Sequence, residues 1–177
     1  SRQLVTVELN EGLKKIGGRA FSFCVSLRSI NFPSTLKEIG RAVFCHCAFS
    51  TVELNEGLKV FGDSAFSGCP SLTSINFPST LEVIESYAVR NCRSLMNAEL
   101  NEGLKRIGNH AFYACRSLRN INFPSTLEVI ESFAFSDCKS LMNAELNEGL
   151  KVIGAGAFCY CTSFTRIEFP STLEEIG

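Results

Sequence analysis

Two short phrases alternate along this chain of 177 residues at a nearly fixed spacing. Asn-Glu-Gly-Leu is found at 10–13, 55–58, 101–104 and 147–150, and Phe-Pro-Ser-Thr-Leu at 32–36, 77–81, 123–127 and 169–173. The repeating units begin at Leu4, Leu27, Phe49, Leu72, Leu95, Leu118, Leu141 and Phe164. A fixed period of 20 to 50 residues is the signature of a solenoid. We therefore interpret residues 1–177 as a single repeat array of about seven and a half coils.

The apolar pattern inside one repeat predicts a short strand followed by turns. Ile121 and Phe123 alternate across Asn122, which is the spacing of a strand with one buried face. Pro124, or the glycine of Asn-Glu-Gly in the other repeats, then favours a turn. The Ala-Phe-x-x-Cys stretch predicts a helical or 3₁₀ turn, and a glycine such as Gly108 favours positive φ. The expected fold is an α/β-type solenoid of short parallel strands and short helical turns.

Charge and hydropathy exclude two classes of partner. The net charge is -1, from 17 basic and 18 acidic side chains, so no strongly basic surface exists to bind nucleic acid. The apolar runs are only a few residues long, far short of the ~20 that a membrane-spanning helix needs. We expect no nucleic-acid partner and no direct membrane insertion.

The repeat closely resembles the BspA-type, or Treponema-type, leucine-rich repeat. The resemblance lies in the pattern Leu-x-x-Ile-x-Phe-Pro-Ser-x-Leu-x-x-Ile-x-x-x-Ala-Phe-x-x-Cys-x-Ser-Leu, quoted from 118 to 141, and it covers essentially the whole chain. It implies a curved, right-handed leucine-rich-repeat superhelix used for binding, often on cell surfaces. The family does not imply catalysis.

Seven of the nine cysteines occupy one repeat position, which predicts a structural column of buried free thiols. They are Cys24, Cys47, Cys69, Cys92, Cys115, Cys138 and Cys161. Their side chains should point in parallel into the core, and their number is odd, so we do not expect disulfides. Cys-His-Cys around His46 lacks a second pair with metal-ligand spacing, so we expect no metal site. We expect His110 to be solvated.

Motifs for catalysis or cofactor binding are absent from the sequence. There is no nucleophile elbow, no phosphate-binding glycine loop after a strand and no metalloprotease helix motif. Paired acids such as Glu174 and Glu175 recur in repeat register, which is typical of a solvated edge. We predict no catalytic residue, no cofactor and no enzyme activity.

The positions that flank the buried residue of each opening strand face outward and form an expected concave sheet. The candidate partner-binding residues on it are Glu53, Asn76, Asn97, Glu99, Asn120, Asn122, Asn143 and Glu145. This face is polar and lacks the Trp, Tyr and Arg side chains that carry most protein–protein hot spots. Two readings stay open, namely a solubilising face and a surface for carbohydrate or weak protein binding.

Two further columns consist of charged residues. Lys59, Glu82, Lys105, Glu128, Lys151 and Glu174 alternate in sign, which indicates control of the stacking register. Arg93, Arg116 and Lys139 place like charges side by side, with Arg90 and Arg119 nearby. Either Asp137 and edge glutamates screen this repulsion, or the strip binds an anionic partner.

These observations favour a non-catalytic recognition or adhesion module that binds a protein or glycan partner through the solenoid surface. The alternative is an intracellular or organellar scaffold, with end-to-end or edge packing in a larger assembly. Family resemblance favours an extracellular or cell-surface location, whereas free thiols are compatible with a reducing compartment. Because neither end has a polar capping unit, we expect the array to be a fragment of a longer chain.

Overall fold

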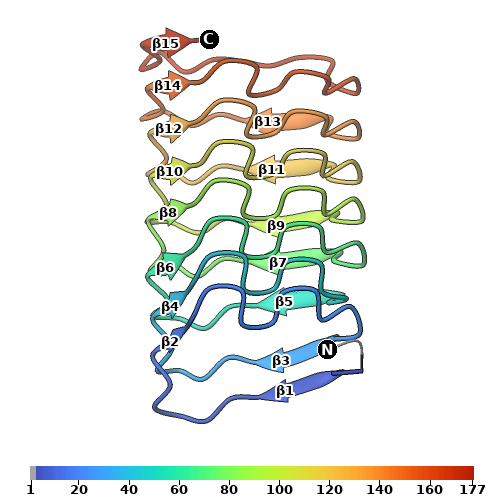
Figure 1. The fold of residues 1–177 in the computed structure, drawn as a ribbon. Helices are drawn as coiled ribbons and strands as arrows, with labels where there is room; N and C mark the ends of the chain where they lie inside the picture. Colours follow the sequence, from blue (N-terminus) through green and yellow to red (C-terminus); the bar gives the residue numbers. More distant parts are fainter. Residues whose placement is uncertain (1–2) are drawn as a thin grey trace.

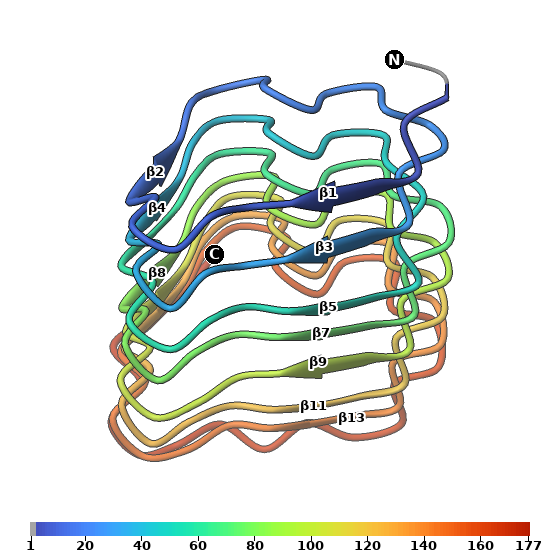
Figure 2. The same cartoon turned by 90° about the horizontal axis from the view of Figure 1, so that it is seen from below.

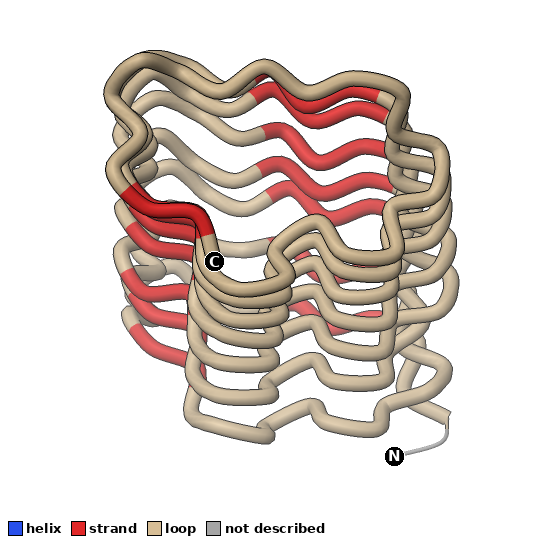
Figure 3. The backbone as a smooth tube through the Cα atoms, turned by 90° about the horizontal axis from the view of Figure 1, so that it is seen from above, coloured by secondary structure: helices blue, strands red, loops and turns tan. Residues whose placement is uncertain are grey.

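The chain winds into a stack of similar coils, as described for residues 3–177 by a computed structural model (Figure 1). The two ends of the chain lie at opposite ends of the stack. Strands occupy two separate parts of each coil, and turns make up the remainder (Figure 3). A coil therefore has a longer strand on one side and a shorter strand on another.

Every longer strand has three residues and every shorter strand has two. The longer strands are β1 (Thr6–Glu8), β3 (Ser29–Asn31), β5 (Thr51–Glu53), β7 (Ser74–Asn76), β9 (Asn97–Glu99), β11 (Asn120–Asn122) and β13 (Asn143–Glu145). The shorter strands are β2 (Lys15–Ile16), β4 (Glu38–Ile39), β6 (Val60–Phe61), β8 (Val83–Ile84), β10 (Arg106–Ile107), β12 (Val129–Ile130), β14 (Val152–Ile153) and β15 (Glu175–Ile176).

The length of the repeat sets the register of the stack. Ser74 pairs with Asn97 and Asn76 with Glu99, so each residue lies beside its equivalent one repeat later. All of the strand pairs are parallel, and the longer strands follow one another along one side of the stack (Figure 2). The predicted parallel repeat solenoid is confirmed.

The inward side chains form one continuous core. The leucines that open the repeats, such as Leu95 and Leu118, are fully buried. Phenylalanines of successive coils stack on one another, and the ring centroids of Phe112 and Phe135 are 4.9 Å apart. Val89 takes the same position in the preceding coil and is also fully buried. Because each coil buries its apolar side chains against its neighbours, the stack is stable only as a whole.

The prediction of helical or 3₁₀ turns is wrong, since residues 3–177 contain neither helix type. No helix is therefore present that could cross a membrane. We call the turns around Ala-Phe-x-x-Cys the third side of each coil. Backbone N–H groups on this third side donate alternately to the next coil and within their own coil. Phe112 donates to Ala134 of the next coil at 2.8 Å, whereas Tyr113 donates to His110 of its own coil at 3.1 Å. A helix would direct both bonds within one coil, so stacking replaces helical bonding here.

Left-handed backbone at two positions of each coil produces this alternation. His110 has φ of 55° and Ala114 has φ of 58°, and the pattern recurs with mostly non-glycine residues. Gly108, in contrast, lacks a positive φ, which corrects our expectation. A Cβ there would lie 2.7 Å from the backbone nitrogen of Ser86, so close contact between coils selects this glycine. The glycine of Asn-Glu-Gly does take positive φ, as at Gly103.

Candidate binding surface

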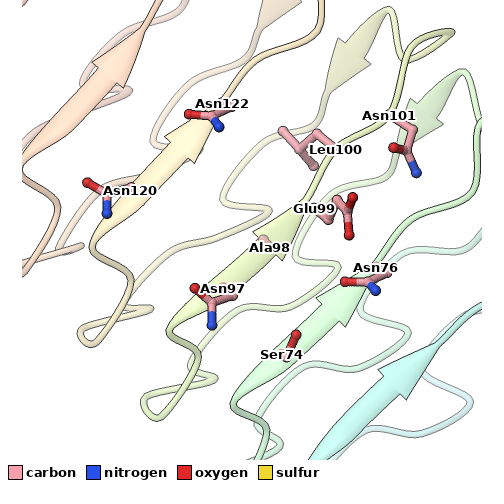
Figure 4. Close-up of a pocket in the computed structure, with 9 residues that line it drawn as sticks. All are labelled: Ser74, Asn76, Asn97, Ala98, Glu99, Leu100, Asn101, Asn120 and Asn122. Atoms are coloured by element: carbon pink, nitrogen blue, oxygen red, sulfur yellow. The ribbon is translucent and has the colours of Figure 1, made fainter.

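The outward side chains of the longer strands form a polar surface that we call the strand face. A groove of about 600 Å³ crosses it over β7, β9 and β11 (Figure 4). Six polar side chains of the three strands line the groove: Ser74, Asn76, Asn97, Glu99, Asn120 and Asn122. Ala98, Leu100 and Asn101 complete its lining. The structure thus brings together five of the candidate residues predicted on this face.

An interruption in strand pairing coincides with the groove. β5, β7 and β9 belong to one sheet, whereas β11 and β13 belong to another. Ala98 is the middle residue of β9, whereas the middle residues of β7 and β11 are the larger Ile75 and Ile121. The groove thus lies where the pairing of the longer strands is interrupted.

The remaining strand-face candidates lie at two smaller hollows, which also coincide with interruptions in pairing. Glu53 lies in one of about 460 Å³ between β3 and β5. Asn143 and Glu145 lie in one of about 290 Å³ between β13 and the segment 166–168. The strand face is thus three separate hollows rather than one uniform sheet.

The six polar side chains of the groove have no partners within the chain. Among residues 3–177, none of them makes a side-chain hydrogen bond or an ion pair. Asn101 differs, because its Nδ2 donates to the Phe77 carbonyl oxygen at 2.5 Å. Unpaired amide and carboxylate groups at the surface are bonded to water and are free to exchange it for a ligand.

Polar side chains at the turn edge, by contrast, form hydrogen bonds that join coils. We define the turn edge as the Asn-Glu-Gly and Pro-Ser-Thr segments. Glu102 accepts bonds from the Ser125 backbone N–H at 3.1 Å and hydroxyl at 2.9 Å. The Thr126 hydroxyl accepts from the Gly103 N–H at 3.0 Å and donates to the Leu104 carbonyl at 2.9 Å.

The hydrogen bonds at the turn edge also account for the lowered pKa of Glu102 and for the alternation of the two sequence phrases. Bonds from the backbone N–H and hydroxyl of Ser125 lower the pKa of Glu102. The same arrangement joins Glu148 to Ser171. The two alternating phrases in the sequence are therefore halves of one intercoil clamp.

The alternating charge column joins other pairs of coils. Lys105 lies 3.0 Å from Glu82, and Lys151 lies 2.9 Å from Glu128, each contacting the preceding coil. The Glu128 carboxylate raises the pKa of Lys151, and Lys151 lowers the pKa of Glu128. The ion pairs of this column and the clamps thus join alternate pairs of coils.

Asp137 pairs with two members of the basic strip. Its carboxylate lies 2.7 Å from Arg116 Nη2 and 3.5 Å from Lys139 Nζ. No ion pair involving Arg93 or Arg119 occurs within residues 3–177, and Arg119 lies apart from the strip, directly before β11. Within residues 3–177, Arg93 is therefore the one member of the predicted three without an ion pair.

A cluster of aromatic side chains on the third side is missing from our sequence-based expectations. His110 is stacked between Tyr87 at 5.2 Å and Phe133 at 5.0 Å, so it is not simply solvated. Arg90 lies over the rings of Tyr87 and Tyr113 at 5.4 and 5.5 Å. Burial, followed by the charge of Arg90, lowers the pKa of His110. Aligning Tyr87, His110 and Phe133 by repeat position is the signal that would have found this cluster.

The cysteine column is placed in the core, and all nine cysteines are free thiols. Cys69 Sγ donates to the Phe44 carbonyl oxygen at 3.2 Å, and Cys138 to that of Phe112 at 3.2 Å. Burial raises the pKa of Cys115 and Cys138, which disfavours the reactive thiolate. No group of three His, Cys, Asp or Glu side chains within residues 3–177 is arranged to hold a metal ion.

Comparisons with known proteins agree with this architecture. A leucine-rich repeat protein from Treponema pallidum is 29% identical, with a TM-score of 0.67 over 91% of this chain and 67% of that one. The pneumococcal vaccine antigen PcpA is 25% identical, with a TM-score of 0.56 over 92% of this chain and 50% of that one. A leucine-rich repeat protein from Eubacterium ventriosum is 19% identical and shares the fold, with a TM-score of 0.83 over 94% of this chain and 45% of that one.

The chain thus spans about half the length of two of these structures. No curated protein sequence matches it. The family model described as "BspA type Leucine rich repeat region (6 copies)" matches residues 1–99 and 84–177. Repeat arrays of this kind are generally non-catalytic and mediate protein interactions. The chain belongs to the BspA-type leucine-rich repeat family.

Proposed function

We propose that this protein is a non-catalytic recognition and adhesion module that holds a macromolecular partner, a protein or a glycan, on its strand face. The observation that carries the proposal is the contrast between two sets of polar residues. Glu102, Ser125 and Thr126 at the turn edge are bonded between coils, whereas Asn97 and Asn120 on the strand face are not. Polar groups that stabilise nothing within the chain are the ones available to a partner.

Family membership supports the same proposal. One of the similar structures is described as a vaccine antigen of pneumococcus. The strand face also carries three hollows that follow one another along the stack, which suits an extended partner. Adhesion through several weak contacts along such a surface gains strength by multivalency.

Partner binding is best tested with immobilised arrays of extracellular proteins and glycans. The test variant combines Asn97→Ala, Glu99→Ala and Asn120→Ala, all within the groove. The control variant combines Lys14→Ala, Lys59→Ala and Glu174→Ala, which alter exposed side chains away from the strand face. We expect the test variant to lose at least tenfold in affinity for the array ligands and the control to keep it. Equal binding by both variants would contradict the proposal.

A second candidate function is that of a scaffold subunit docked through the third side. The aromatic cluster with Arg90 favours it, because Tyr, Phe and Arg are enriched in protein interfaces. Phe133 is 38% exposed despite its stacking. A Tyr113→Ala, Phe133→Ala variant that loses a protein partner, while the groove variant keeps it, would favour this function over the first.

A further inference from the structure

The groove over β7, β9 and β11 is a candidate site for one class of ligand, and this inference rests on the proposed function. We propose that it binds a neutral oligosaccharide. Four of its six unpaired polar side chains are asparagines, and each carboxamide both donates and accepts hydrogen bonds. Sugar hydroxyls also do both, so neighbouring carboxamides match neighbouring hydroxyls.

The charge of the groove argues for a neutral ligand. Glu99 is its only ionisable side chain, and no Lys or Arg lines it. A carboxylate repels a sialylated or sulfated sugar, and a single carboxylate offers little to a polycation. Glu99 instead supplies a strong acceptor for sugar hydroxyl donors.

The shape of the groove argues for an oligosaccharide over a protein surface. Its volume of about 600 Å³ lies within the range of ~300–1,000 Å³ for small-ligand sites. It spans three strands, or about 10 Å at the usual strand spacing. Ala98 and Leu100 offer C–H surface for the apolar side of a sugar ring. Protein hot spots need aromatic or Arg side chains, and this lining has neither.

Direct titration with sugars provides the test. The probes are neutral hexose and N-acetylhexosamine oligosaccharides, with sialylated and sulfated ones in parallel. We expect a neutral oligosaccharide to bind and to shift the NMR signals of the side-chain amides of Asn97 and Asn120. Asn97→Ala with Asn120→Ala should weaken binding about tenfold or more, because several hydrogen bonds are lost. Asn31→Ala, at the position equivalent to Asn76 and Asn122 but outside the groove, should leave affinity unchanged.

Charge selectivity gives a second, independent readout. Glu99→Gln should keep the neutral ligand and improve binding of its sialylated counterpart. The inference is overturned if no neutral oligosaccharide binds, if the Asn31 and groove variants lose affinity equally, or if only anionic sugars bind. Should a protein ligand on the array still depend on the groove residues, the proposed function stands and only the oligosaccharide is wrong.

Discussion

The Sγ atom of Cys115 lies 3.3 Å from the carbonyl oxygen of Val89, a residue of the preceding coil. Six successive thiols repeat this contact at 3.1 to 3.3 Å, from Cys47 to Cys161. Each thiol fills a small space in the core and donates to a buried carbonyl of the preceding coil. The column thus bonds coil to coil without any covalent link.

Replacing Cys115 with alanine should destabilise the stack. The change leaves a small cavity and removes one of the two donors to the Val89 carbonyl, the other being the Cys92 N–H, so we expect a loss of about 1–3 kcal/mol in the free energy of unfolding. Urea unfolding followed by circular dichroism measures it. Cys45→Ala, at a half-buried position outside the column, is the matched control and should cost less. Equal losses would show that the column position has no special role.

Alkaline pH should weaken the fold through the same thiols. Burial raises the pKa of Cys47 from its ordinary value of 9.0 to about 12. Unfolded chains thus lose this proton first, so the stabilisation is complete below pH 9 and is lost as pH rises toward 12. The urea concentration at the midpoint of unfolding should fall for the natural protein as the pH is raised from 8 to 12. The midpoint of the Cys47→Val variant should fall less steeply with pH. An identical fall in both proteins would contradict a role for the Cys47 thiol in the loss of stability.

The intercoil clamp should depend on a single threonine hydroxyl. Thr126→Val keeps the shape of the side chain but leaves the Gly103 N–H and the Leu104 carbonyl without their partner. We expect a loss of about 1–2 kcal/mol in the free energy of unfolding. Thr51→Val is the control, because the exposed Thr51 hydroxyl on the strand face makes no hydrogen bond in the chain, and valine suits a strand. Comparable losses in both variants would rule out the clamp.

The period of the sequence was enough to predict the stack, the longer strands and the core, but not the two-residue strands such as β12. Residues equivalent to Leu118, Ile121 and Cys138 recur at fixed spacing. Because all of them must be buried, successive coils can stack in only one register. The turns on the third side could not be predicted, because left-handed backbone there is occupied by residues such as Phe23 and Asp137 rather than glycine. Intercoil hydrogen bonds hold these residues in place, and such bonds have no local sequence signal.

The groove could be predicted only in part. Outward positions such as Asn97 and Asn120 follow from alternation along a strand. The interruption between β9 and β11, in contrast, depends on how neighbouring backbones pack, and Ala98 does not signal it, because the equivalent Ala144 pairs with Ile121. The stack of His110 on Tyr87 forms between coils, so a reading of one repeat at a time misses it.

Removing the Arg90 charge should make His110 easier to protonate. Burial and the Arg90 cation both lower the pKa of His110 below its ordinary value of 6.5, so the folded state favours the neutral ring. The resulting stabilisation is present above pH 6.5 and is lost as pH falls through the lowered pKa. Arg90→Gln should raise the pKa of His110 toward 6.5, as read from the NMR titration of its ring protons. Arg28→Gln, an exposed change on another side of the coil, should leave the pKa of His110 unchanged. If both variants titrate like the natural protein, burial alone sets the pKa and the contact with Arg90 has no electrostatic role.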